Sequence, residues 1–148
     1  MYEPAWKRLV ESLNDRGFES RYLDRLMDRL GTVTMKMAVG RGYHTLEREI
    51  IEEMAYALRR AEDKVNLALL RVDLALDEIT NNGDPSRLGE FEDAFETRRQ
   101  EAMRARWEFS VHREALGMVR HDILYELYPI PPRRRPLSAT TPHAQQAE

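Results

Sequence analysis

Residues 88–123, LGEFEDAFETRRQEAMRARWEFSVHREALGMVRHDI, repeat mostly apolar residues at alternating steps of three and four. This spacing is a heptad repeat, whose a and d residues lie along one side of an α-helix and pack against a neighbouring helix. The repeat runs without a slip through Leu88, Phe91, Phe95, Arg98, Ala102, Ala105, Phe109, His112, Leu116, Val119 and Ile123. The stretch therefore predicts one long helix, over about residues 85–128, with a coiled-coil seam.

A second heptad repeat precedes the first in a segment, 45–80, that contains no glycine or proline. Its a and d residues are Ile51, Met54, Leu58, Ala61, Val65, Ala68, Val72, Ala75 and Ile79. Alanine at successive d positions permits a close approach of the neighbouring helix, towards the ~8 Å end of interaxial distances. We therefore predict a second long helix over about 45–80.

The sequence NNGDP at 81–85 separates these two helices, with Asp84 as a helix cap and Pro85 in a first helical turn. Because the connection is short, the helices should be antiparallel neighbours. A register centred on this turn places Lys64 opposite Glu101. At ~1.5 Å per residue, the second helix should extend about two turns beyond the first.

Before the hairpin, apolar spacing predicts short helices at about 4–16 and 20–30, with Ser20 as a cap and Gly31 as a stop. Residues 31–44 alternate like a strand at Val33, Met35, Met37 and Val39, but a single strand is not stable alone. We favour a connector over a strand that pairs with a second copy. Residues 129–148, rich in proline and arginine, predict a disordered tail after a helical domain at 1–128.

Each long helix carries a second apolar stripe away from its seam. The first helix has Leu67, Leu70 and Leu74, and the second has Met103, Trp107, Val111, Met118 and Tyr125. Soluble monomers avoid large exposed apolar patches. The short helices can cover one stripe, so the other predicts a protein partner, with a homodimeric four-helix bundle as the favoured form.

Four arginines, Arg99, Arg106, Arg113 and Arg120, occupy position e of successive heptads. Acids of the short helices (Asp24 and Asp28) or of a second copy are the expected partners. An acidic protein and nucleic-acid phosphate are alternatives.

Polar residues within the seams predict structural roles. Arg98 occupies a d position, where a buried charge needs a partner, and Glu62 lies near the same layer. His112 is expected to be a hydrogen-bonded core residue. Glu108 and His112 also suggest a metal site, but their spacing is i, i+4, whereas carboxylate-bridged bundles use Glu-x-x-His.

The composition excludes several functional classes. The 148 residues contain no cysteine, so disulfides and thiolate chemistry are excluded, and the net charge of −3 disfavours general nucleic-acid binding. No signal-peptide core or 18-residue apolar run occurs, so we expect a cytoplasmic protein without membrane contact.

These patterns together predict an all-α, non-catalytic assembly or adaptor protein, with no cofactor and no evident small-molecule substrate. A helical-bundle metal protein of the ferritin-like kind is the alternative, and a weak nucleic-acid binder is the third.

Overall fold

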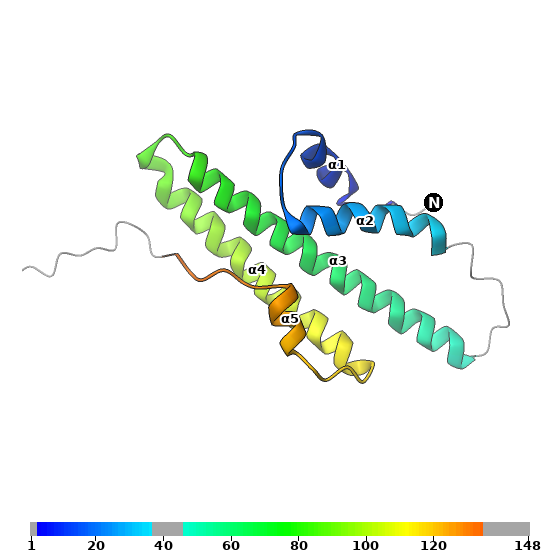
Figure 1. Ribbon diagram of the computed structural model, residues 1–148. Helices are drawn as coiled ribbons and strands as arrows, with labels where there is room; N and C mark the ends of the chain where they lie inside the picture. Colours follow the sequence, from blue (N-terminus) through cyan, green and yellow to red (C-terminus); the bar gives the residue numbers. More distant parts are fainter. Residues whose placement is uncertain (1–2, 37–45, 135–148) are drawn as a thin grey trace, which may run out of the picture.

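The structure, a computed structural model, describes residues 3–36 and 46–134 (Figure 1). The described residues are helical, with connecting turns. In chain order they form α1 (Lys7–Asp15), α2 (Arg21–Lys36), α3 (Leu46–Asn81), the 3-10 turn η1 (Pro85–Arg87), α4 (Leu88–Ala115) and α5 (Asp122–Leu127). In these residues no helix is long and apolar enough to cross a membrane.

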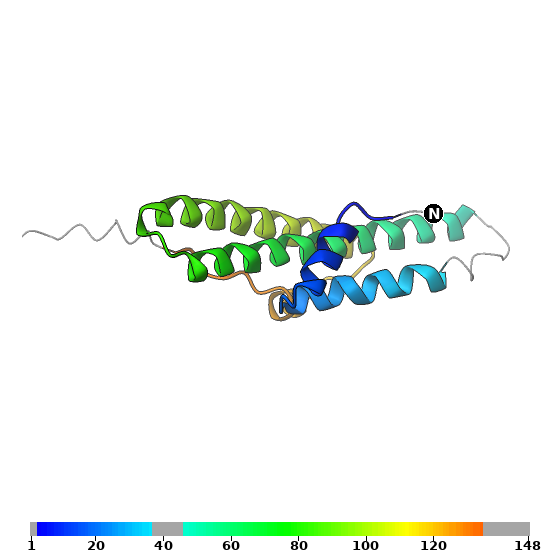
Figure 2. The same cartoon turned by 90° about the horizontal axis from the view of Figure 1, so that it is seen from above.

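Helices α3 and α4 pack antiparallel as the predicted hairpin (Figures 1 and 2). The turn forms as expected, because the Asp84 side chain accepts a hydrogen bond from Ser86 N at 3.0 Å and Pro85 begins the following 3-10 turn. The central part of the seam is buried, at Ala61, Val65, Ala68, Val72 and Ala75 of α3 and Phe95, Ala102, Ala105 and Phe109 of α4. The heptad repeats therefore predict the helical pairing correctly.

The register of the hairpin differs from the predicted one. Lys64 Nζ lies 2.7 Å from Glu108 Oε2, one heptad beyond the expected Glu101, and Glu101 instead pairs with Arg98 at 3.0 Å. The turn is longer than assumed, because η1 takes up residues 85–87 and α4 begins three residues later, so residues further along α4 lie level with those of α3.

Helix α4 ends at Ala115, so the prediction of a helix reaching residue 128 is wrong. Gly117 has a φ of +81°, the left-handed conformation that glycine adopts without strain. The N–H of Met118 donates to Arg113 O at 3.0 Å and that of Gly117 to Glu114 O at 2.9 Å, which is a Schellman motif. The overhang is consequently reversed, because α3 extends beyond the end of α4 (Figure 1). Residues 46–53 of α3 are exposed.

Helix α2 lies along α3, on the side of α3 that carries Leu67, Leu70 and Leu74. Side chains at three levels join the two helices: Ser20 Oγ to Asp73 Oδ2 at 2.6 Å, Arg25 Nη1 to Asn66 Oδ1 at 3.5 Å, and Arg29 Nε to Asp63 Oδ1 at 3.2 Å. The residue numbers rise on α2 as they fall on α3, so the helices are antiparallel. Helix α1 packs against α2.

Helix α2 continues through Gly31 to Lys36, so the predicted stop is wrong and Val33 and Met35 belong to a helix. A glycine inside a helix costs only about 1 kcal/mol, which an otherwise favourable segment tolerates. Residues 37–45 of the predicted connector, and residues 135–148 of the predicted tail, lie outside the described part of the chain.

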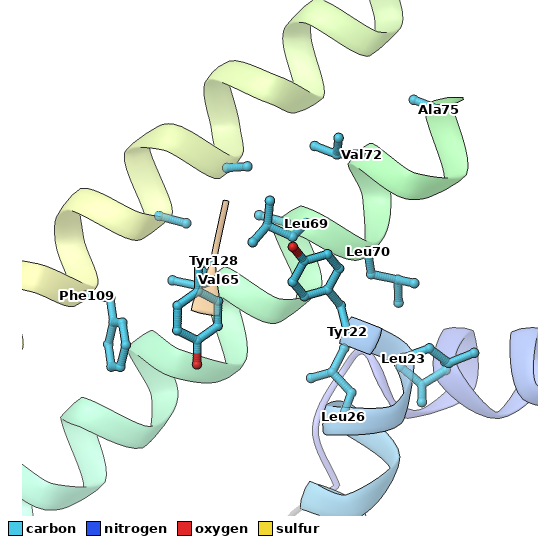
Figure 3. Packing of buried hydrophobic residues seen from close by; sticks show 14 of the residues in the cluster. Tyr22, Leu23, Leu26, Val65, Leu69, Leu70, Val72, Ala75, Phe109 and Tyr128 are labelled. Carbon is cyan, nitrogen blue, oxygen red and sulfur yellow. The ribbon is translucent and has the colours of Figure 1, made fainter. Parts of the chain in front are cut away.

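The chain after α4 turns back along the hairpin, and we name residues 122–131, which include α5, the strap. Leu124 and Tyr128 of the strap are buried. Figure 3 shows Tyr128 beside Phe109 and Val65, and the two rings meet edge to face with centroids 5.7 Å apart. The strap therefore extends the core that α3 and α4 begin.

Candidate interaction surface

The outer face of α4 carries exposed apolar side chains at one-turn spacing. Trp107 is 66% exposed, with Met103 and Val111 one turn to either side, each 43% exposed. All three point away from the seam, because they occupy outer positions of the heptads. Helices α1 and α2 pack on the α3 side of the hairpin and leave this face open (Figures 1 and 2). We name Met103, Trp107 and Val111 the α4 stripe.

The other two predicted members of this stripe are not on α4. Met118 lies in the turn after Gly117, and Tyr125 lies on α5; both are exposed. The Tyr125 ring centroid is 4.6 Å from the guanidinium carbon of Arg106, which holds the ring next to α4. The predicted continuous stripe is therefore shorter, because α4 ends early.

The predicted stripe on the first long helix is not an open surface. Leu70 is completely buried, and Leu67 and Leu74 are half-buried against the core. Figure 3 shows Leu70 facing Tyr22 and Leu23 of α2. The short helices thus cover this stripe.

The arginine row has a different partner from the acids we expected. Arg99 Nε donates to Pro131 O at 2.8 Å, and Arg106 Nη1 donates to Tyr128 O at 3.0 Å. Both acceptors are backbone carbonyls of the strap, so these two arginines attach the strap to α4. Arg99 also forms an ion pair with Glu96 at 3.2 Å.

The rest of the row lies where the chain reverses. Arg113 is half-buried, and its Nη1 is buried with no hydrogen-bond partner among the described residues. Arg120 is exposed and pairs with Asp122 at 3.1 Å. The row therefore does not form one continuous basic surface, and this arrangement does not favour binding of nucleic-acid phosphate or of an acidic protein.

A polar cluster that we did not predict holds the strap against α2 and α3. The Tyr128 hydroxyl donates to Glu62 Oε1 at 3.2 Å, and burial together with the Glu62 charge raises the pKa of Tyr128. Arg25 lies 5.0 Å from the Tyr128 ring centroid and donates to Leu127 O at 2.8 Å. Gly117, inside an otherwise helical run, was the available signal for this reversal.

The predicted polar core is corrected by these contacts. The Arg98 side chain is 43% exposed and forms an ion pair with Glu101, whereas Glu62 accepts the hydrogen bond from the Tyr128 hydroxyl. His112 is exposed, so the prediction of a core histidine is wrong. The buried carboxylate in this part of the chain is Glu92, at position e.

The arrangement at Glu108 does not favour a metal ion. Its carboxylate is engaged by Lys64 at 2.7 Å and by Arg104 at 3.5 Å, and the hydrogen bond from Lys64 lowers its pKa. Across residues 3–36 and 46–134, no group of three or more histidine, aspartate or glutamate side chains is placed to bind one.

Comparison with known proteins adds no relative. No protein-family model, no curated protein and no solved structure matches this chain. The α4 stripe, defined by its geometry, is therefore the basis for a functional assignment.

Proposed function

We propose that this protein is a non-catalytic assembly or adaptor module that binds a helical partner through the α4 stripe. The observation that carries the proposal is the exposure of Trp107 at 66% on a helix whose opposite face is packed into the core. Tryptophan is a frequent anchor at protein interfaces, where its large surface becomes buried. Exposed apolar side chains gathered on one face indicate such a site.

A second copy of the chain is the partner that best fits the stripe. Met103 and Val111 lie four residues before and after Trp107, so each is about 6 Å along the helix from it. If two α4 helices cross antiparallel at Trp107, Met103 of one copy meets Val111 of the other. This is the self-complementary contact that a two-fold axis requires. Because the stripe faces away from the seam, the two α4 helices then lie at the centre of the dimer with one α3 helix on either side, so the four helices form a layer instead of the expected bundle around one core.

Sedimentation equilibrium tests this proposal with a matched pair of variants. The wild type should have about twice the chain mass of 17.4 kDa. Trp107→Ala should weaken association at least about thirtyfold, because loss of an interface anchor costs about 2 kcal/mol or more. Tyr56→Ala is the control, since Tyr56 is another exposed aromatic residue, on α3. A monomeric wild type at high micromolar concentration, or equal effects of the two variants, would refute the proposal.

A further inference from the structure

The turn at 116–121 interrupts a heptad repeat that the sequence continues. Val119 and Ile123 occupy seam positions, yet they are 71% and 45% exposed in this structure. The six residues of the turn contain no proline. With the exception of Gly117, which is a weak helix former, nothing in this stretch opposes a helical conformation.

The matching residue on α3 is also exposed. In a register where every a residue lies level with a d residue of the other helix, Phe109 lies level with Ala61, and both are buried. Ten residues further along, the same register would place Val119 level with Ile51, which is 62% exposed. Val119 and Ile51 could thus form one layer of the seam, but both are exposed, because α4 ends before it reaches this level.

The contacts that hold the strap involve residues 122–131 and do not depend on the conformation of the turn that precedes them. Its buried side chains are Leu124 and Tyr128, and its hydrogen bonds join Tyr128 Oη to Glu62, Leu127 O to Arg25, Tyr128 O to Arg106 and Pro131 O to Arg99. An identical strap from another copy would make every one of them. This is the condition for domain swapping, in which an element is exchanged between identical chains.

We propose that the chain forms a segment-exchanged dimer. In it the turn at 116–121 straightens, α4 and α5 join into one helix, and the strap of each copy binds α2, α3 and α4 of the other. The strap contacts are all retained, and the layer of Val119 and Ile51 closes in addition. The dimer loses the Schellman turn at Gly117, the 2.7 Å contact between His121 Nε2 and Glu114 Oε1 across that turn, and the independent motion of two chains. This inference goes beyond the proposed function, because it uses the strap and not the α4 stripe.

Gly117→Ala tests the proposal, because a methyl group at this position meets no atom within 4 Å and acts through the backbone alone. Compared with glycine, alanine disfavours the left-handed turn and favours the straight helix. Each effect shifts the equilibrium between turn and helix at one hinge by several-fold to tenfold. Since the dimer contains two hinges, its association constant should rise on the order of a hundredfold or more. Gly17→Ala is the matched control, because Gly17 also has a positive φ, +74°, and an unobstructed Cβ position. It should lower stability without causing association.

Both variants are made in a Trp107→Ala background, which removes the contact proposed for the α4 stripe. Any association that remains then tests exchange of the strap independently of the α4 stripe. Association is measured by sedimentation and helicity by circular dichroism. A dimer with increased helicity is the expected result for Gly117→Ala. A folded monomer, with or without increased helicity, would overturn the proposal.

Energy transfer then distinguishes exchange from any other dimer. The chain lacks cysteine, so single labels can be attached at Glu126→Cys on the strap and Asp93→Cys on α4, both exposed positions. In the Gly117→Ala dimer, a donor on one copy and an acceptor on the other should give the same distance as the two labels on one copy in the monomeric Gly117 form. A different distance between copies would overturn the exchange.

Discussion

At the residue scale, Tyr128 is the side chain that fixes the C-terminal part of the described chain to the hairpin. Its ring packs edge to face against Phe109 and beside the guanidinium of Arg25, and its hydroxyl bonds to Glu62. Aromatic residues with a polar end suit such a position, because the ring fills the core while the hydroxyl finds a partner. Tyr128 thus connects α2, α3, α4 and the strap.

Tyr128→Phe should lower the free energy of unfolding by about 1–2 kcal/mol, because it removes a hydrogen bond to a charged acceptor while the ring remains. Urea unfolding measures the change. Tyr125→Phe is the control, because Tyr125 is 60% exposed and should give almost no change. Equal effects of the two variants would show that the contact between Tyr128 and Glu62 does not stabilise the fold.

Asp73 gives a prediction about pH. Burial raises the pKa of Asp73, although the hydrogen bond from Ser20 acts in the opposite direction. The folded state therefore binds a proton at Asp73 more readily than the unfolded state, and this contribution to stability is present at low pH and is lost as the pH rises. Asp73→Asn removes the titration.

The stability of the wild type relative to Asp73→Asn should consequently increase as the pH falls from 7 to about 4, near the ordinary aspartate pKa. Urea unfolding at several pH values checks this difference. A relative stability that falls over the same range would mean that the Ser20 contact outweighs burial.

At the element scale, two glycines show what the sequence could predict and what it could not. Gly31 was expected to end a helix and lies inside one, whereas Gly117 was expected to lie inside a helix and ends one. Glycine permits either conformation at low cost, so the choice depends on distant contacts. For Gly117 these include the bond from Arg25 to Leu127 O, which joins residues 102 positions apart.

The hairpin was predictable because heptad spacing and a capped turn are local features of the sequence. The α4 stripe was predictable in part for the same reason, at Met103, Trp107 and Val111. The strap was not, because the heptad pattern through Val119 and Ile123 favours a straight helix and the burial of Tyr128 emerges only in three dimensions. The register was missed because η1 lengthened the turn.

The close packing of α3 and α4 leads to a test with Ala68→Leu. Ala68 is buried in the seam, and added methylene groups there should lower the free energy of unfolding by roughly 1–3 kcal/mol. Asp77→Ala, on the exposed face of the same helix, should be nearly silent. Thermal or urea unfolding compares the two variants. Stabilisation by leucine would mean that the helices do not approach each other closely at this level.

At the scale of the whole molecule, α3 is the central helix. Helix α2, the strap and α4 pack around its middle part (Figure 2). Asn66 of α3 bonds to Arg25 of α2, Glu62 bonds to Tyr128 of the strap, and the alanine seam packs against α4. The N-terminal helices and the strap therefore cover the apolar side chains on the side of the hairpin where they pack. The outer face of α4 keeps its apolar stripe, which is why we assign the contact with a partner to that face.

The measurement that tests this assignment most directly is acrylamide quenching of Trp107 fluorescence at increasing protein concentration. The chain has two tryptophans, so a Trp6→Phe variant leaves Trp107 as the reporter. If the α4 stripe is the contact surface, quenching should be strong in the dilute monomer and should fall over the concentration range in which the mass doubles from 17.4 kDa. Quenching that stays equally strong while the mass doubles would contradict the account, because the dimer would then leave Trp107 exposed.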